Sequence, residues 1–262
     1  MKNSKLILSG LVAVFALVSI GCSDDEGNAL TSVTSPPTSI NVTFSSNEEA
    51  KIEFDPAVAS QSKFDVKMTD QFGEVAEVKD AGGSSPIMVS GFPKGMIYTV
   101  EMAAGTASDM GDYGDKTEPM LASAKEDVNN MVRIDMLNAI NDARAETRMC
   151  GGEEMQAVAP LNWDDKLETA ALVHTVDMAD NNFFAHTSAT DNSSPGDRIT
   201  KEGYNWSYYG ENIHKGSMTA QAAVASWLTS PPHCKNIMSP NFKEVGAANK
   251  GTYWTQNFGK SR

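Results

Sequence analysis

This sequence of 262 residues is poor in basic side chains. It has 21 lysines and arginines against 34 aspartates and glutamates, which gives a formal net charge of −13. Proteins that bind nucleic acid or an anionic membrane surface through charge need basic patches. We therefore expect no nucleic-acid partner.

Long hydrophobic runs are also lacking, apart from one at the N-terminus. Lys2 and Lys5 precede an apolar stretch from Leu6 to Ile20. No later stretch approaches the roughly 20 apolar residues that a transmembrane helix needs. A short basic start followed by an apolar run of this length is typical of a secretory signal peptide. We expect residues 1–21 to be that peptide, and the chain after Cys22 to be soluble.

Cysteine is scarce, and its three positions are informative: Cys22, Cys150 and Cys234. The run 19–22, Ser-Ile-Gly-Cys, is followed at once by acidic residues and resembles the lipobox of bacterial lipoproteins, although Ser19 replaces the usual leucine. The resemblance implies that Cys22 carries lipid and anchors the protein to a membrane, periplasmic or surface-exposed, in the cell envelope. The alternative is an ordinary signal peptide cut near Gly21. With Cys22 lipidated, Cys150 and Cys234 are left as one possible pair, and an oxidising compartment predicts their disulfide.

Residues 22–37 are polar and rich in Ser, Thr and Pro, which predicts an extended tether. From residue 38 to residue 122 the apolar residues alternate with polar ones in short runs separated by turn residues. This period-two pattern is typical of half-buried strands. We expect an all-β, antiparallel sandwich of the immunoglobulin or fibronectin III type over 38–122.

The stretch from Val89 to Val100 resembles the E strand, turn and F strand of a fibronectin type III domain. In that family a tyrosine near the start of the F strand fills the corner, and Tyr98 occupies the equivalent position. An unrelated immunoglobulin-like sandwich is the alternative, because the tryptophan often found on the B strand is absent. We expect a spacer or adhesion module, since no titratable cluster occurs here.

From residue 127 to residue 262 the apolar period becomes helical, with strand-like pieces in between. Helices are expected from about residue 128 to 144, from Asp164 or Asp165 to about 179, and from about 218 to 228. The sequence Pro231-Pro232 is expected to end the third of these helices. Strands are expected over 208–214, 242–248 and 253–258. The fold class is therefore α/β in this half.

Several segments of this half resemble, in the family's order, the bacterial branch of the CAP family, which joins cysteine-rich secretory proteins, antigen 5 and pathogenesis-related proteins. They are Leu161-Asn162-Trp163-Asp164, Phe183 to Thr187, Gly210-Glu211-Asn212-Ile213, Trp227 to His233, Phe242 to Gly246, and Tyr253 to Gly259. The resemblance covers about residues 130–260 and implies a three-layer α-β-α sandwich. Pro232 replaces a glycine of the family pattern, and Cys234 replaces a basic residue.

The resemblance also implies a surface cleft lined by two histidines and a glutamate, whose equivalents here are His186, His233 and Glu211. Neutral imidazole nitrogens bind Zn²⁺ and similar divalent ions, so His186 and His233 are the candidate metal ligands. The family's second glutamate has no clear match, and Gln221 and Ser226 are the nearest polar residues.

Two functions remain open. The first is a non-enzymatic module that binds a lipid, glycan, peptide or weakly held divalent metal in the cleft. The second is a metal-assisted hydrolase or peptidase, with His186 and His233 as ligands and Glu211 as base. Because this sequence offers few site residues, we favour binding. We interpret His174 as a packed helix residue, His214 as an exposed residue or one on the cleft rim, and Trp163, Trp227 and Trp254 as core.

Overall fold

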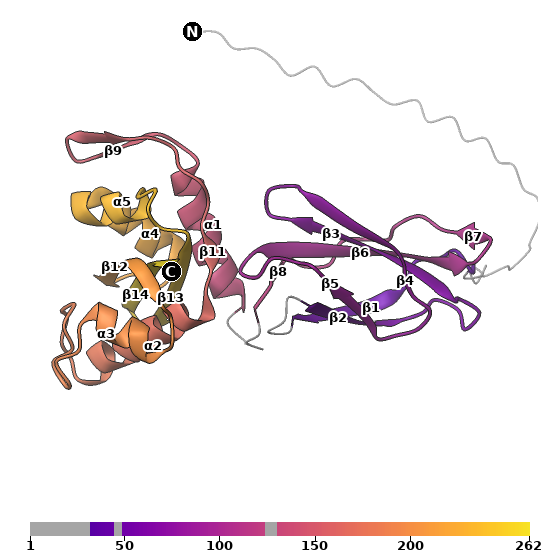
Figure 1. Cartoon of the computed structure of the whole chain (residues 1–262), viewed down its shortest axis with the longest axis horizontal. Coiled ribbons are helices and arrows are strands. Elements are labelled where there is room, and N and C mark those ends of the chain that lie inside the picture. The colour runs from indigo at the N-terminus through magenta and orange to yellow at the C-terminus, as the bar shows by residue number, and fades with distance from the viewer. Residues whose placement is uncertain (1–31, 45–48, 124–129) are drawn as a thin grey trace, which may run out of the picture. The chain divides into compact units, whose positions relative to one another are not determined.

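The computed structural model describes residues 32–44, 49–123 and 130–262 (Figure 1). The predicted signal peptide, the predicted lipidation site Cys22 and most of the predicted tether lie outside the described residues. Of the helices in the described part of the chain, none is long and apolar enough to cross a membrane.

The strands of the first half form two antiparallel sheets, as the period-two pattern predicts. One sheet has the order β1-β2-β5, and the other has the order β4-β3-β6-β7 with β8 also paired to β6. The bounds are β1 Thr38–Phe44, β2 Glu49–Asp55, β3 Lys63–Asp70, β4 Val75–Gly82, β5 Ile87–Ser90, β6 Ile97–Thr106, β7 Asp109–Met110 and β8 Met120–Leu121.

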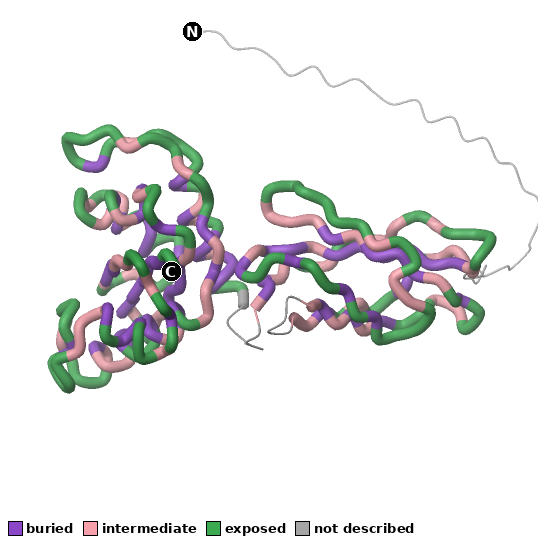
Figure 2. Tube along the Cα trace, viewed as in Figure 1, coloured by how far each residue is buried: buried purple, intermediate pink, exposed green. Residues whose placement is uncertain are grey.

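The alternating apolar residues of these strands meet in one buried cluster. Strand β2 buries Ala50, Ile52 and Phe54, and the exposed or half-buried residues lie between them. They pack with Val66 and other apolar residues of the neighbouring strands. Figure 2 shows that β6 is buried along most of its length. Apolar side chains removed from water on the inner strand faces therefore account for this core.

The second half is built on a four-stranded sheet with the order β11-β13-β14-β12. Strand β11 runs parallel to β13, and the other two pairs are antiparallel. The bounds are β11 Asn162–Trp163, β12 Trp206–Lys215, β13 Glu244–Lys250 and β14 Tyr253–Ser261. Because β12 pairs only with β14, it forms an edge of this sheet.

Five helices accompany this sheet in the described part of the chain: α1 Asn130–Arg144, α2 Asp165–Asp180, α3 Pro195–Lys201, α4 Ala220–Thr229 and α5 Pro231–Ile237. Figure 1 shows α2 and α3 on one side of the strands and α4 and α5 on the other. Helix α2 begins where the sequence predicts, since the Asp164 side chain accepts hydrogen bonds from the backbone N–H groups of Lys166 and Leu167.

Alternate residues of β13 face different helices on the two sides of the sheet. Val245 and Ala247 belong to the buried cluster formed with α1, α4 and α5. Gly246 lies between them, and a Cβ added there would come within 2.1 Å of the backbone nitrogen of Glu168 in α2. Successive side chains of a strand point to opposite faces, so the glycine allows α2 to lie directly on the sheet.

The structure differs from the sequence prediction around Pro231-Pro232. These prolines follow the end of α4, as expected, but they also form the first turn of α5. Proline is tolerated at the first helical positions because the N–H that it lacks has no partner there. A short hairpin, β9 Arg148–Cys150 and β10 Glu153–Met155, was also not predicted.

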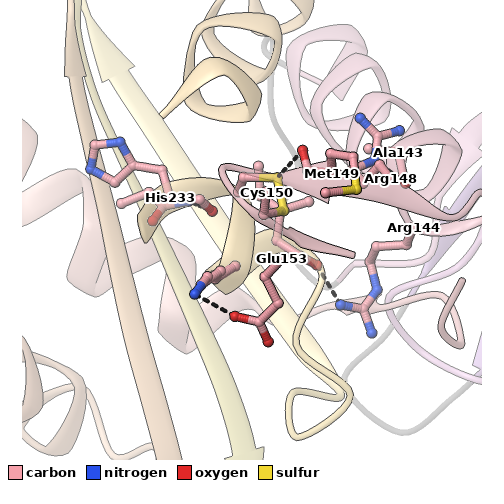
Figure 3. Close-up of a disulfide and its surroundings, with 11 residues drawn as sticks. Ala143, Arg144, Arg148, Met149, Cys150, Glu153 and His233 are labelled. Atoms are coloured by element: carbon pink, nitrogen blue, oxygen red, sulfur yellow. Dashed lines mark hydrogen bonds and ion pairs between the residues drawn. A yellow bond between two sulfur atoms is a disulfide. The ribbon is translucent and has the colours of Figure 1, made fainter. Parts of the chain in front are cut away.

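The predicted disulfide between Cys150 and Cys234 is confirmed. The two Cα atoms are 5.5 Å apart, and the bond links residues separated by 84 positions in the sequence. Figure 3 shows this disulfide with His233 and Glu153 drawn around it. The bond therefore ties the β9–β10 hairpin to α5, beside one of the candidate site histidines.

Candidate functional site

His186 and Glu211 come from separate segments and meet directly. His186 lies in the segment between α2 and α3, and Glu211 lies in β12. The His186 Nδ1 atom is 2.8 Å from Glu211 Oε1. A carboxylate can only accept a hydrogen bond, so Nδ1 carries the proton in this contact. In the neutral ring, Nε2 is then left with its lone pair free.

The sequence prediction missed a third member of this group, Arg198 in α3. Its Nη2 atom donates to Glu211 Oε2 at 2.8 Å and to the backbone carbonyl of His186 at 3.0 Å. The side chains of Arg198 and Glu211 are 4% and 2% exposed, whereas that of His186 is 51% exposed. The group is therefore a buried ion pair carrying a half-exposed imidazole.

A signal for Arg198 exists in the sequence. It is the only lysine or arginine between Lys166 and Lys201. A buried carboxylate needs a positively charged or hydrogen-bonding partner nearby. Once Glu211 is taken as buried, Arg198 is a candidate partner because it is the first basic residue after the His186 segment.

His233 lies in α5 and is half-buried. Its backbone carbonyl accepts a hydrogen bond from Asn212 Nδ2 at 3.3 Å, which joins α5 to β12 next to Glu211. Burial lowers the pKa of His233, and the charges that His186 and His214 carry when protonated lower it further. The ring is therefore neutral at pH 7, which is the form that binds metal.

His214 lies near the end of β12 and is half-buried. Its Nε2 atom lies 2.7 Å from Ser217 Oγ, and its Nδ1 atom lies 3.3 Å from Ser226 Oγ. Burial lowers the pKa of His214. Both ring nitrogens have hydroxyl partners, so this histidine is held by the protein's own side chains. Ser226, one of two residues considered for the missing second glutamate, serves here as such a partner.

Few side-chain atoms of the candidate site are available to a metal ion. No group of three or more His, Cys, Asp or Glu side chains in the described part of the chain is arranged to hold a metal. Both oxygens of Glu211 already have partners. His186 Nε2 and the ring of His233 have none among residues 32–44, 49–123 and 130–262. Two imidazoles are fewer than the three or four protein ligands of most zinc sites, so an ion held there would need water to complete its coordination.

The surroundings of His233 are fixed by several contacts. Lys235 Nζ forms an ion pair with Glu153 Oε2 at 2.5 Å, so the hairpin and α5 are joined by charge as well as by the disulfide. Gly151 has a φ of +70°, and a Cβ added there would meet Pro231 at 3.1 Å. A side chain at position 151 would therefore be strained and would press on the residue that begins α5.

His174 and three tryptophans of the second half are buried. His174 is fully buried within α2, as interpreted from the sequence. Trp163, Trp227 and Trp254 belong to the main buried cluster of the second half, which confirms them as core residues. Trp227 also donates from Nε1 to the Ile213 carbonyl at 2.9 Å.

Curated relatives cover only part of this chain. The uncharacterized protein YkwD of Bacillus subtilis (strain 168) is 38% identical over 107 residues, which are 40% of this chain and 41% of the relative. The uncharacterized membrane protein YlbC of the same organism is 34% identical over 101 residues, 38% of this chain and 29% of the relative. The chain thus matches less than half the length of either relative.

Among solved structures, an extracellular protein from Bacillus anthracis containing an SCP domain is similar along 95% of this chain and 100% of that chain, with 14% identity and a TM-score of 0.42. Residues 137–258 match the family model of the cysteine-rich secretory protein (CAP) family. This segment spans the helices and strands that carry His186, Glu211 and His233. The chain is therefore similar to the CAP family over residues 137–258.

Proposed function

We propose that the CAP domain is a non-enzymatic binding module that holds a divalent metal ion between His186 and His233. The types of the free donor atoms support this, because His186 Nε2 and the neutral His233 ring are nitrogen ligands that Zn²⁺ accepts. Glu211 would act as the partner that orients His186, in the way that carboxylates commonly support metal-binding histidines. The bound ion would supply a Lewis-acidic centre to which a small polar ligand could attach.

The state of the Glu211 carboxylate favours binding over hydrolysis. Glu211 is the only carboxylate assigned to the site, and its two oxygens are engaged by Arg198 and His186. A general base must reach the proton that it abstracts, directly or through one water. Glu211 has both oxygens bound by neighbouring side chains and is only 2% exposed, so it presents no solvent-facing oxygen for that role.

Zinc titration of the purified protein tests this proposal. We expect weak, reversible binding of Zn²⁺ that is lost in both His186→Ala and His233→Ala, since each variant removes one ligand. His214→Gln is the matched control, because its ring nitrogens are already occupied, and it should bind as the wild type does. Equal zinc affinity in all four proteins would overturn the proposal.

Activity assays on the same purified proteins distinguish metal binding alone from metal-assisted hydrolysis. Hydrolysis of casein or of a simple ester that requires zinc and His186 would favour the metal-assisted hydrolase. We expect no such activity above that of the His186→Ala variant. Activity that persists in both alanine variants would come from elsewhere in the protein or from a contaminant.

We further propose that the first half is a fibronectin III-like sandwich, and that the second half has the three-layer arrangement. The strand orders β1-β2-β5 and β4-β3-β6-β7 support the former. So does the Tyr98 hydroxyl, which donates to the Pro93 carbonyl at 3.3 Å, five residues earlier, as in a tyrosine corner. The opposite faces used by Val245 and Gly246 support the latter.

We propose that the protein is exported and held at a membrane by lipid on Cys22, with the sandwich as a spacer. In cells, Cys22→Ser should move the protein from the membrane fraction to the soluble fraction and remove the mass of the lipid. Continued membrane partition of Cys22→Ser with a covalent lipid would contradict this anchor.

A further inference from the structure

We infer that His174 and Arg198 are positioning residues. Their buried side chains hold the main chain at His186 and fix which nitrogen of its ring keeps an unshared lone pair. Two consecutive backbone carbonyls, those of Ala185 and His186, are bound by these two buried side chains. The inference deepens the proposed metal binding and rests on it only for the zinc measurement.

His174 supplies the first contact. It is fully buried in α2, and its Nε2 atom lies 2.8 Å from the Ala185 carbonyl. A carbonyl can only accept, so Nε2 must carry the proton. Burial lowers the pKa of His174, in agreement with a neutral ring. The imidazole is therefore the Nε2–H tautomer, with an unprotonated Nδ1.

Arg198 supplies the second contact and connects it to the site. Nη1 donates to the Ser193 carbonyl at 2.9 Å, and Nη2 donates to both the His186 carbonyl and Glu211 Oε2. The guanidinium thus holds the main chain of His186 and, through Glu211, its ring. Arginine suits this position because its planar group offers donors in several directions.

The remaining buried atoms of the two residues are complementary. His174 Nδ1 and Arg198 Nε have no hydrogen-bond partner within the described ranges. One is an acceptor and the other a donor, and both residues line the same cavity of about 300 Å³. A neutral imidazole can sit near the guanidinium without adding a second buried positive charge, whereas a lysine could not.

The arrangement gives the two histidines opposite tautomers. His174 donates from Nε2 to a carbonyl, whereas His186 donates from Nδ1 to a carboxylate. Because the His186 ring is held by Glu211 and its main chain by Arg198, its Nε2 lone pair has one defined position. Loss of either support should let the ring rotate and populate the other tautomer.

Nitrogen NMR of the ¹⁵N-histidine-labelled protein at pH 7.5, without metal, tests the inference directly. Long-range ¹H–¹⁵N spectra of the wild type should show His174 as the Nε2–H form and His186 as the Nδ1–H form. His174 in the Nδ1–H form, or His186 as a mixture of both forms, would overturn the inference without any substitution.

Two substitutions extend the test. His174→Gln keeps an amide N–H that can reach the Ala185 carbonyl and should leave the His186 spectrum unchanged. His174→Asn is too short and should give mixed His186 tautomers and, if zinc binds, an affinity lower by about 10-fold or more. Met178→Ala, also in the buried face of α2, is the control for lost packing alone and should leave the His186 tautomer intact.

The zinc measurement and the tautomer measurement test different claims, so either one can fail without the other. If the wild type binds no zinc, the proposed function falls, and the tautomers still decide the positioning role. If His174→Asn and Met178→Ala shift the His186 tautomer equally, His174 is only a packing residue and the inference is wrong.

Discussion

Arg198 and Glu211 form an ion pair that is almost sealed from solvent, with Nη2 and Oε2 2.8 Å apart and side-chain exposures of 4% and 2%. Removing one partner of such a pair leaves a buried charge without compensation. Replacing both can be nearly neutral, because desolvation of the two charges offsets their attraction.

We expect Arg198→Met to lower the free energy of unfolding by about 3–5 kcal/mol. The double variant Arg198→Met, Glu211→Gln should be clearly more stable than the single one, because the uncompensated charge is gone. Urea denaturation measures both. Lys235→Met, which removes the exposed pair with Glu153, is the control and should cost about 1 kcal/mol or less. Equal losses in Arg198→Met and Lys235→Met would contradict the buried role of the pair.

Features were predictable from the sequence when the residues that determine them lie close together in the chain. Helix α2 was predicted because Asp164 and the apolar spacing both lie within it. Arg198 was missed because a lone arginine is usually solvated, and its burial depends on Glu211, a residue of another element. Helix α5 was missed because Pro-Pro both ends one helix and can begin the next. The β9–β10 hairpin has three residues per strand, which is too short for a recognisable alternating pattern, and the disulfide of Cys150 links it to a distant segment.

The disulfide should contribute substantially to the stability of the second half of the chain. Closing a loop of 84 residues is worth about 4–5 kcal/mol in the chain-entropy treatment. The double variant Cys150→Ala, Cys234→Ala should therefore unfold at a much lower urea concentration than the oxidised protein. Both cysteines are buried, so a mild reductant should act slowly on the folded wild type. A double variant with an unchanged urea midpoint would refute this contribution.

Acid should destabilise this domain through His174. The pKa of His174 is lowered in the folded protein by burial, while in the unfolded chain it is about 6.5. Below that pH the unfolded state binds a proton that the folded state does not, so stability falls as the pH falls. Above it both states are neutral, and the contribution is constant.

We expect the free energy of unfolding to decline from pH 7 toward pH 5, and the decline to be shallower in His174→Gln. Denaturant titrations at a series of pH values measure the slope. His233 and His214, whose pKa values are also lowered, add to the slope and should keep it above zero in the variant. An unchanged slope in His174→Gln would show that this histidine does not stay neutral in the folded state.

The Tyr98 hydroxyl should stabilise the first half of the chain and have no effect on zinc binding by the second half. Tyr98→Phe removes the hydrogen bond to the Pro93 carbonyl while keeping the buried ring. We expect a loss of about 0.5–1.5 kcal/mol in the unfolding of the sandwich, the usual net value of one hydrogen bond. The zinc affinity of the site in the second half should not change. Altered zinc affinity would mean that the sandwich influences the site.

The disulfide-linked hairpin beside His233 means that the two imidazoles are held in place by different interactions. His233 stands between Pro232 and the disulfide-bonded Cys234, so covalent constraints limit its main chain. His186 lies in a segment outside helix and strand and is held by hydrogen bonds and a buried charge pair. Reducing conditions would loosen one half of the site and leave the other in place, whereas loss of the ion pair would do the opposite. A bound ion would thus report on the redox state of its compartment through one ligand and on the integrity of the buried charges through the other.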